Sequence, residues 1–130
     1  MELLAPAGDK DKLIMAIEYG ADAVYLASTR YGLRTFAGNF DLDGLKWAVE
    51  YAHERKVKVY VTVNIIPHES DLEDLPQYIS FLDSIQVDAL ICADLGVISM
   101  VRKIAPNMPI HVSTQANITN SESAKVFISM

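Results

Sequence analysis

The sequence has little cysteine, few basic residues and no long apolar run. Its single cysteine, Cys92, excludes a disulfide framework and any metal or cluster site built from several cysteines of this chain. We expect Cys92 to lie in a buried strand as a small apolar side chain. No run approaches the roughly 18 apolar residues of a membrane span, and the N-terminus lacks the basic region of a signal peptide. A cytoplasmic protein without a membrane partner is therefore expected.

Basic residues are outnumbered by acidic ones, 11 to 17, which gives a formal net charge of −6. A broad surface for nucleic acid would need clustered lysine and arginine, so this balance argues against one. It leaves open a local basic patch, and RNA bound through other parts of a full-length protein. Hydrophobic residues make up 51% of the chain and charged residues 22%, which are the proportions of one globular domain over residues 1–130.

Five strand-like segments, each followed by a helix-like segment, recur along the chain at a spacing of roughly 25 residues. The strands are predicted at residues 2–8, 24–28, 57–66, 87–93 and 110–117. Helices are predicted to begin near Asp9, Asp41 or Asp43, Ser70, Asp94 and Asn120, because each of these residues can cap a helix. Pro76 indicates either a kink in the third helix or a regular part that begins near Asp74.

This alternation predicts an α/β fold with a parallel sheet, for which two architectures compete. A doubly wound sheet usually carries a glycine-rich phosphate loop, and the sequence has no G-x-G-x-x-G. A (β/α)8 barrel takes about 250 residues, so five βα units would be its first five-eighths. Polar faces on two strands also fit a barrel interior better than a doubly wound sheet. We therefore expect an incomplete TIM-type (β/α)8 barrel made of the first five βα units.

The third and fifth predicted strands each place polar side chains on one face. These side chains are Tyr60, Thr62 and Asn64 in the third strand, and His111, Ser113 and Gln115 in the fifth. Hydrogen-bonding groups that point the same way need water, a partner or a ligand, so the two faces predict a common pocket. His111 lies early on its strand, and we expect it to be a core histidine rather than a catalytic one.

Several short segments, in this order along the whole chain, resemble peptidase family U32, the collagenase-like proteins of undetermined catalytic type. The segments are residues 3–8 (LLAPAG), 21–25 (ADAVY), 34–40 (RTFAGNF), 93–96 (ADLG) and 113–115 (STQ). The resemblance implies an N-terminal barrel followed by a cysteine-bearing segment, which this sequence does not contain. It thus implies the N-terminal fragment of an enzyme, inactive by itself.

The family resemblance also implies two kinds of activity for the parent protein. Some members were first labelled proteases. Others are implicated in oxygen-independent hydroxylation of tRNA, ribosomal RNA or the ubiquinone ring, with four cysteines that hold an iron–sulfur cluster. No Ser-His-Asp arrangement can be read from the sequence, so we favour hydroxylation of RNA or a ring substrate over a metal-dependent peptidase. No cofactor is expected within these residues, although a cluster is possible in the full-length protein.

In (β/α)8 barrels the catalytic and binding residues lie at the C-terminal ends of the strands and in the loops that follow. The predicted substrate-binding residues at these positions are Arg34, Asn39, Asn64, Asp94 and Gln115. Arg34 would grip a carboxylate or phosphate, or pair with a loop carboxylate. Asp94 would bind substrate or cap a helix, and Asn39 would bind substrate or occupy a turn. We expect a small anionic or nucleobase-like substrate, and assign no catalytic residue and no metal site.

The alternative to an enzyme is a non-catalytic module that associates with itself. A sheet open at its first and fifth strands exposes unpaired edges, which are a template for association. The sequence therefore also predicts a homodimer or a larger assembly that covers those edges.

Overall fold

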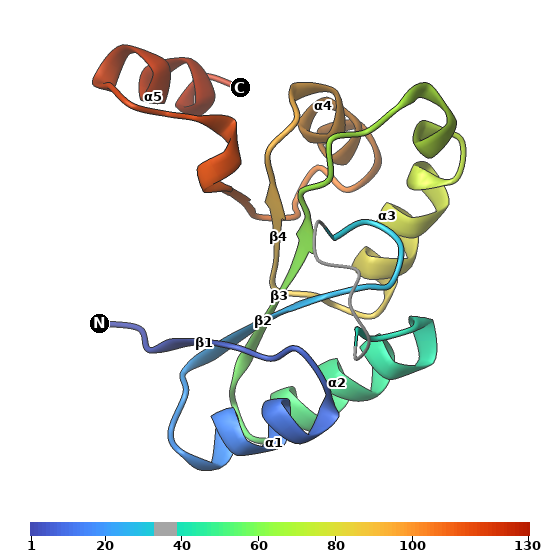
Figure 1. Cartoon of the computed structure of the whole chain (residues 1–130), viewed down its shortest axis with the longest axis vertical. Helices are drawn as coiled ribbons and strands as arrows, with labels where there is room; N and C mark the ends of the chain where they lie inside the picture. Colours follow the sequence, from blue (N-terminus) through green and yellow to red (C-terminus); the bar gives the residue numbers. More distant parts are fainter. Residues whose placement is uncertain (33–38) are drawn as a thin grey trace.

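The computed structural model describes residues 1–32 and 39–130, in which five strands are each followed by a helix, as predicted (Figure 1). The strands are β1 (Leu4–Pro6), β2 (Ala23–Ala27), β3 (Lys58–Val63), β4 (Ala89–Cys92) and β5 (Ile110–Val112). The helices are α1 (Lys10–Glu18), α2 (Leu42–Glu54), α3 (Leu75–Ser84), α4 (Leu95–Ile104) and α5 (Ser121–Ile128), with short 3-10 helices η1 (Glu69–Leu72) and η2 (Thr114–Ala116). No helix among the described residues combines the length and the apolar character needed to span a bilayer.

The five strands form one parallel sheet in the order β1-β2-β3-β4-β5. In a doubly wound sheet the strand order reverses at a switch point, whereas in a barrel each strand lies beside the next in sequence. The observed order is sequential throughout. The α/β prediction is thus confirmed, and the arrangement is consistent with part of a TIM-like barrel.

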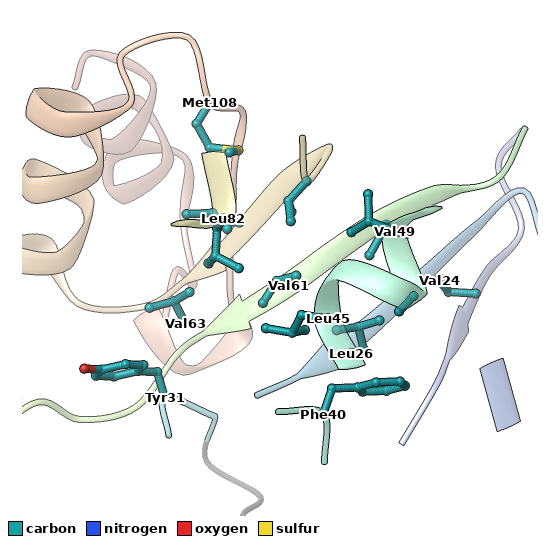
Figure 2. Close-up of a cluster of buried hydrophobic side chains, with 14 of the residues drawn as sticks. Val24, Leu26, Tyr31, Phe40, Leu45, Val49, Val61, Val63, Leu82 and Met108 are labelled. Carbon is teal, nitrogen blue, oxygen red and sulfur yellow. The ribbon is translucent and has the colours of Figure 1, made fainter. Parts of the chain in front are cut away.

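The main core lies between the sheet and helices α1 to α4, which cover one face of the sheet (Figure 1). Helix α5 has no fully buried residue and packs against this core through Phe127. Alternate residues of β3 point into this core, and Val59, Val61 and Val63 are fully buried there. Figure 2 shows Val61 and Val63 in this cluster. Cys92 is also fully buried, as predicted. The opposite face of the sheet, which we call the open face, carries Tyr60 and the other polar residues of β3. The alternation of β3 thus places its valines in the core and its polar residues on the open face.

Side chains predicted to cap helices do so at four helix starts. The accepting residues and donor N–H groups are Asp9 with Lys12 (2.9 Å), Asp41 with Gly44 (2.7 Å), Asp94 with Val97 (3.0 Å) and Asn120 with Ser123 (2.9 Å). The backbone hydrogen bond from Lys12 is the largest cause of a lowered pKa for the Asp9 carboxyl. Of the two alternatives for the third helix, the start near Asp74 is confirmed, because α3 begins after Asp74 with Pro76 in its first turn, where proline is tolerated. The start at Ser70 is wrong, since Ser70 lies in η1.

Two aspartates that precede strands, Asp22 and Asp88, tie neighbouring strands together at their amino ends. The Asp22 carboxylate accepts the N–H of Leu3 at 2.7 Å, just before β1. The Asp88 carboxylate accepts the N–H of Val59 at 2.7 Å and also contacts the His53 ring at 2.7 Å. The repeated Asp-Ala dipeptide before β2 and β4 is therefore a structural device at the end of the sheet opposite to the expected site.

The fifth strand is much shorter than predicted. β5 ends at Val112, and residues 114–116 form η2, which Asn117 closes in the left-handed conformation at a φ of 56°. Asparagine tolerates this conformation better than most residues, so the polar stretch turns instead of continuing the strand. The predicted alternation therefore fails beyond Val112. The prediction that His111 lies in the core is also wrong, because its side chain is exposed on the open face at the edge of the sheet.

Candidate functional site

A cavity of about 400 Å³ opens on the open face of the sheet, near the carboxyl ends of the strands. Its apolar lining consists of Leu4, Pro6, Ala7, Gly8, Leu26, Ala27 and Ile91. Its polar lining consists of Tyr25, Asn39, Thr62, Asn64, Ser113, Thr114 and Gln115. The cavity has the size of an ordinary small-molecule site, and in (β/α)8 barrels this end of the sheet carries the chemistry.

Asn64 follows the last residue of β3 and lines the cavity between the polar residues of two other segments. Its Oδ1 atom is buried and has no hydrogen-bond partner among the described residues. A buried amide oxygen without a partner carries an unrecovered desolvation cost. A ligand donor that reached this oxygen would recover that cost.

Asn39 lies where the chain returns to the end of β2. Its amide N–H donates to the carbonyl of Ser28 at 3.4 Å. The next residue, Phe40, pairs with β2, because its N–H donates to Ala27 at 3.1 Å and its carbonyl accepts from Thr29 at 3.2 Å. This backbone pairing places Asn39 at the rim of the cavity. The two predicted roles of Asn39, a turn residue and a substrate-binding residue, are therefore compatible.

Gln115 reaches the cavity from η2 rather than from a strand. Its side chain is exposed, and its Oε1 accepts a hydrogen bond from the Ser113 hydroxyl at 3.1 Å. That bond orients the amide and leaves its N–H groups available to a ligand. Gln115 therefore lies at the predicted end of the sheet, but in a 3-10 helix and not in a strand.

The other two predicted residues do not join this cluster. Asp94 is absent from the lining, and one of its carboxylate oxygens accepts the Val97 N–H as the cap of α4. Arg34 lies outside the described residues. The structure thus brings together Asn39, Asn64 and Gln115 of the five predicted residues.

Sequence reasoning missed the aromatic and aliphatic part of the lining, above all Tyr25 and Ile91. Both are identified by register, because Tyr25 pairs with Tyr60 and Ile91 pairs with Thr62. In a parallel sheet, side chains of paired residues point to the same face. The alternation of β2 and β4 would have revealed them if the strands had first been aligned with β3.

No charged side chain lines the cavity within the described part of the chain. The groups that it offers are amides, hydroxyls and one tyrosine ring that is 37% exposed. Amides present a donor and an acceptor side by side, which is the pattern displayed by the edges of nucleobases and of peptide groups. The cavity therefore suits a neutral, planar ligand with several hydrogen-bonding groups.

Cys92 does not belong to this site. Its thiol is on the core side of β4, and burial raises its pKa to about 12. Such a thiol stays protonated at neutral pH, whereas metal and cluster ligation requires the thiolate. Among residues 1–32 and 39–130, no three His, Cys, Asp or Glu side chains are close enough to hold a metal ion.

The sequential parallel sheet is that of part of a TIM-like barrel, and a cavity lies at the carboxyl end of its strands. Residues 8–130 match the profile of peptidase family U32, and the chain belongs to this family. The resemblance inferred from short motifs is thereby confirmed.

Two relatives illustrate what the chain is similar to. It is 45% identical to tRNA hydroxylation protein P of Helicobacter pylori, over 98% of this chain and 30% of that protein. It is 38% identical to 23S rRNA 5-hydroxycytidine C2501 synthase of Escherichia coli, over 96% of this chain and 18% of that protein. The chain therefore spans less than a third of the length of these relatives.

The fold also matches a solved structure, that of the U32 peptidase Mk0906. The TM-score is 0.81, over 99% of this chain and 55% of that one, at 16% sequence identity. At this identity the match establishes the shared fold.

Proposed function

We propose that this chain is the base-binding part of an enzyme that hydroxylates RNA, and that the cavity receives the target nucleobase. The observation that carries the proposal is the neutral, amide-lined cavity at the carboxyl ends of the strands. Similarity to proteins named for tRNA and ribosomal RNA hydroxylation supports RNA as the substrate class. The higher identity to the tRNA protein favours tRNA.

A cavity of this kind suits a single nucleobase that is no longer stacked on its neighbours in the RNA. Enzymes that modify a base inside RNA extrude it into a pocket and read its edge by hydrogen bonds. Asn39, Asn64 and Gln115 would supply those hydrogen bonds, and Tyr25 would offer a ring face for stacking. These residues bind and orient the base, and they leave the oxidation itself to groups that the cavity does not contain.

The iron–sulfur cluster implied by the family resemblance does not fit these residues. Such clusters are held by four cysteine thiolates, or by cysteine and histidine together. The sequence has one cysteine, and its thiol is buried on the other side of the sheet from the cavity. We derive no step through a cluster, and we propose that any cluster of the parent enzyme uses other ligands.

A nucleoside titration tests the proposal on the chain itself. We expect cytidine or uridine to shift the amide signals of cavity residues in ¹⁵N NMR spectra. Asn64→Leu should weaken this binding about fivefold or more, because a pair of hydrogen bonds to a base edge contributes about 1–3 kcal/mol. The same substitution should leave the unfolding midpoint unchanged or slightly raised, because the Asn64 Oδ1 is buried without a partner.

Asn107→Leu is the matched control, since Asn107 is exposed in the turn before β5, at the other end of the strands. This control should bind the nucleoside as the wild type does. Equal binding by the wild type and Asn64→Leu would overturn the proposal, as would shifts confined to residues outside the cavity.

A peptidase is the alternative that the family name suggests. The two serines near the site are engaged otherwise: Ser28 is 1% exposed, and the Ser113 hydroxyl donates to Gln115. Neither arrangement resembles an activated nucleophile with a neighbouring base. We propose no peptidase mechanism for these residues.

We also propose that the chain associates with itself through its edge strands. In the described sheet β1 and β5 each pair on one side only, and Leu4 and Val112 are 41% and 38% exposed there. Exposed strand edges favour pairing with another chain. Light scattering at high micromolar concentration should report a dimer or larger species, and a strictly monomeric mass would contradict this.

A further inference from the structure

One row of paired residues crosses the open face at the level of the cavity. Ala27 pairs with Thr62, Thr62 with Ile91, and Ile91 with His111. The first three line the cavity. Since neighbouring strands lie about 4.8 Å apart and paired side chains share a face, His111 stands directly beside the cavity, next to Ile91.

The His111 ring packs against the Tyr60 ring and is otherwise exposed. Its centroid lies 4.6 Å from that of the Tyr60 ring, at an interplanar angle of 75°, which is a favourable edge-to-face contact. The side chain is otherwise exposed, and its ring nitrogens make no hydrogen bond or ion pair with any described residue. The Tyr60 contact therefore positions the imidazole, and its ring nitrogens stabilise no other described part of the fold.

Tyr60 is itself held by Glu2. The tyrosine hydroxyl donates to both carboxylate oxygens of Glu2, at 2.9 and 3.0 Å, and Lys58 lies 3.7 Å from the same carboxylate. Burial, followed by the hydrogen bond to Glu2, raises the pKa of Tyr60 to about 12, so the ring under His111 stays neutral. The negative charge of Glu2 and the positive charge of Lys58 largely cancel at the amino ends of the strands.

Among the described residues, β4 contributes the uncharged Ala89 and Ile91 to the open face, and β2 contributes Tyr25. The Asp88 carboxylate also acts on Tyr60, but it lies before β4 and is bound to His53 and to the N–H of Val59. Histidine is the side chain whose charge ordinarily changes between pH 5 and 8. His111 thus stands beside a cavity whose described lining carries no charge.

We propose that His111 binds the phosphate adjacent to the nucleobase held in the cavity. The inference rests on the function proposed above and adds a second contact, to the RNA backbone. The amides accept the base, whereas the backbone phosphate needs a cation or a hydrogen-bond donor at the rim. A neutral imidazole donates one hydrogen bond to a phosphate oxygen, and the protonated ring adds an ionic attraction.

The test compares a nucleoside with a dinucleoside monophosphate, cytidine with CpC, at low ionic strength where screening is weak. The phosphodiester of CpC keeps one negative charge over the range in which histidine titrates. For the wild type, we expect CpC to bind about fivefold to tenfold more tightly near pH 5.5 than near pH 8, and cytidine to bind equally at both. Near pH 5.5, CpC should also shift the ring-proton signal of His111.

His111→Gln should remove the pH dependence of CpC binding and leave cytidine binding unchanged. The matched control is His68→Gln, because His68 is an exposed histidine that does not line the cavity. This control should keep the full pH dependence. The ring-proton signal reports on the wild type directly, so the test does not depend on how well a variant folds.

The outcomes separate this inference from the proposed function. If cytidine binds but CpC shows no pH dependence, or if His111→Gln keeps that dependence, the phosphate contact is wrong and the base-binding cavity stands. If neither compound binds, both the cavity's proposed function and the phosphate contact fall.

Discussion

Replacing Leu45 with alanine is expected to lower the free energy of unfolding by about 3 kcal/mol. Leu45 is fully buried, and Figure 2 shows its side chain between α2 and the strands that carry Leu26 and Val61. Alanine would remove the buried methyl groups and leave a cavity that the surrounding side chains refill only in part. Urea unfolding followed by circular dichroism measures this loss as a lower midpoint with an unchanged slope.

Leu42 offers a matched control on the same helix, because it is 47% exposed in the first turn of α2. Leu42→Ala removes the same atoms from a position that packs little, so its cost should stay within about 0.5 kcal/mol. Similar losses for the two variants would mean that α2 does not pack against the sheet as described.

Asp88→Ala is expected to cost about 2 kcal/mol through lost hydrogen bonds to a charged group. The substitution leaves the N–H of Val59 without its acceptor and His53 without its partner, at the point where β3 begins. Both contacts lie at the amino end of the sheet, so nucleoside binding at the other end should be unchanged in the folded variant. Urea unfolding and the nucleoside titration measure the two effects separately.

Asp83→Ala is the control for this prediction, since Asp83 is an exposed residue near the end of α3. We expect a change within about 0.5 kcal/mol. If Asp88→Ala changed the free energy of unfolding as little as Asp83→Ala does, the repeated Asp-Ala dipeptide would have no part in holding the strands together.

Features that depend on local chemistry could be predicted from the sequence. The apolar positions of α2 were recognisable from their spacing, and Leu45, Ala48, Val49 and Ala52 are all buried. The caps at Asp41 and Asp94 were likewise predictable, because a short acceptor before an apolar stripe satisfies free N–H groups at a helix start.

Features that depend on neighbouring strands could not be predicted as well. The early position of His111 on its strand predicts a core residue, but the strand is at the edge of the sheet and the side chain is exposed on its open face. Gln115 was expected on a strand, but the left-handed conformation of Asn117 closes a 3-10 turn there. Which polar residues meet around the cavity depends on register between strands, and this is a tertiary property that no single segment displays.

The central claim is that the cavity amides bind a nucleobase, and the side-chain amide signals of asparagine and glutamine test it most directly. On addition of cytidine or uridine, we predict that the side-chain N–H signals of Asn64, Asn39 and Gln115 shift together with one dissociation constant, whereas that of Asn107 stays fixed. Signals of the three cavity amides that remain unchanged at saturating nucleoside would contradict the account.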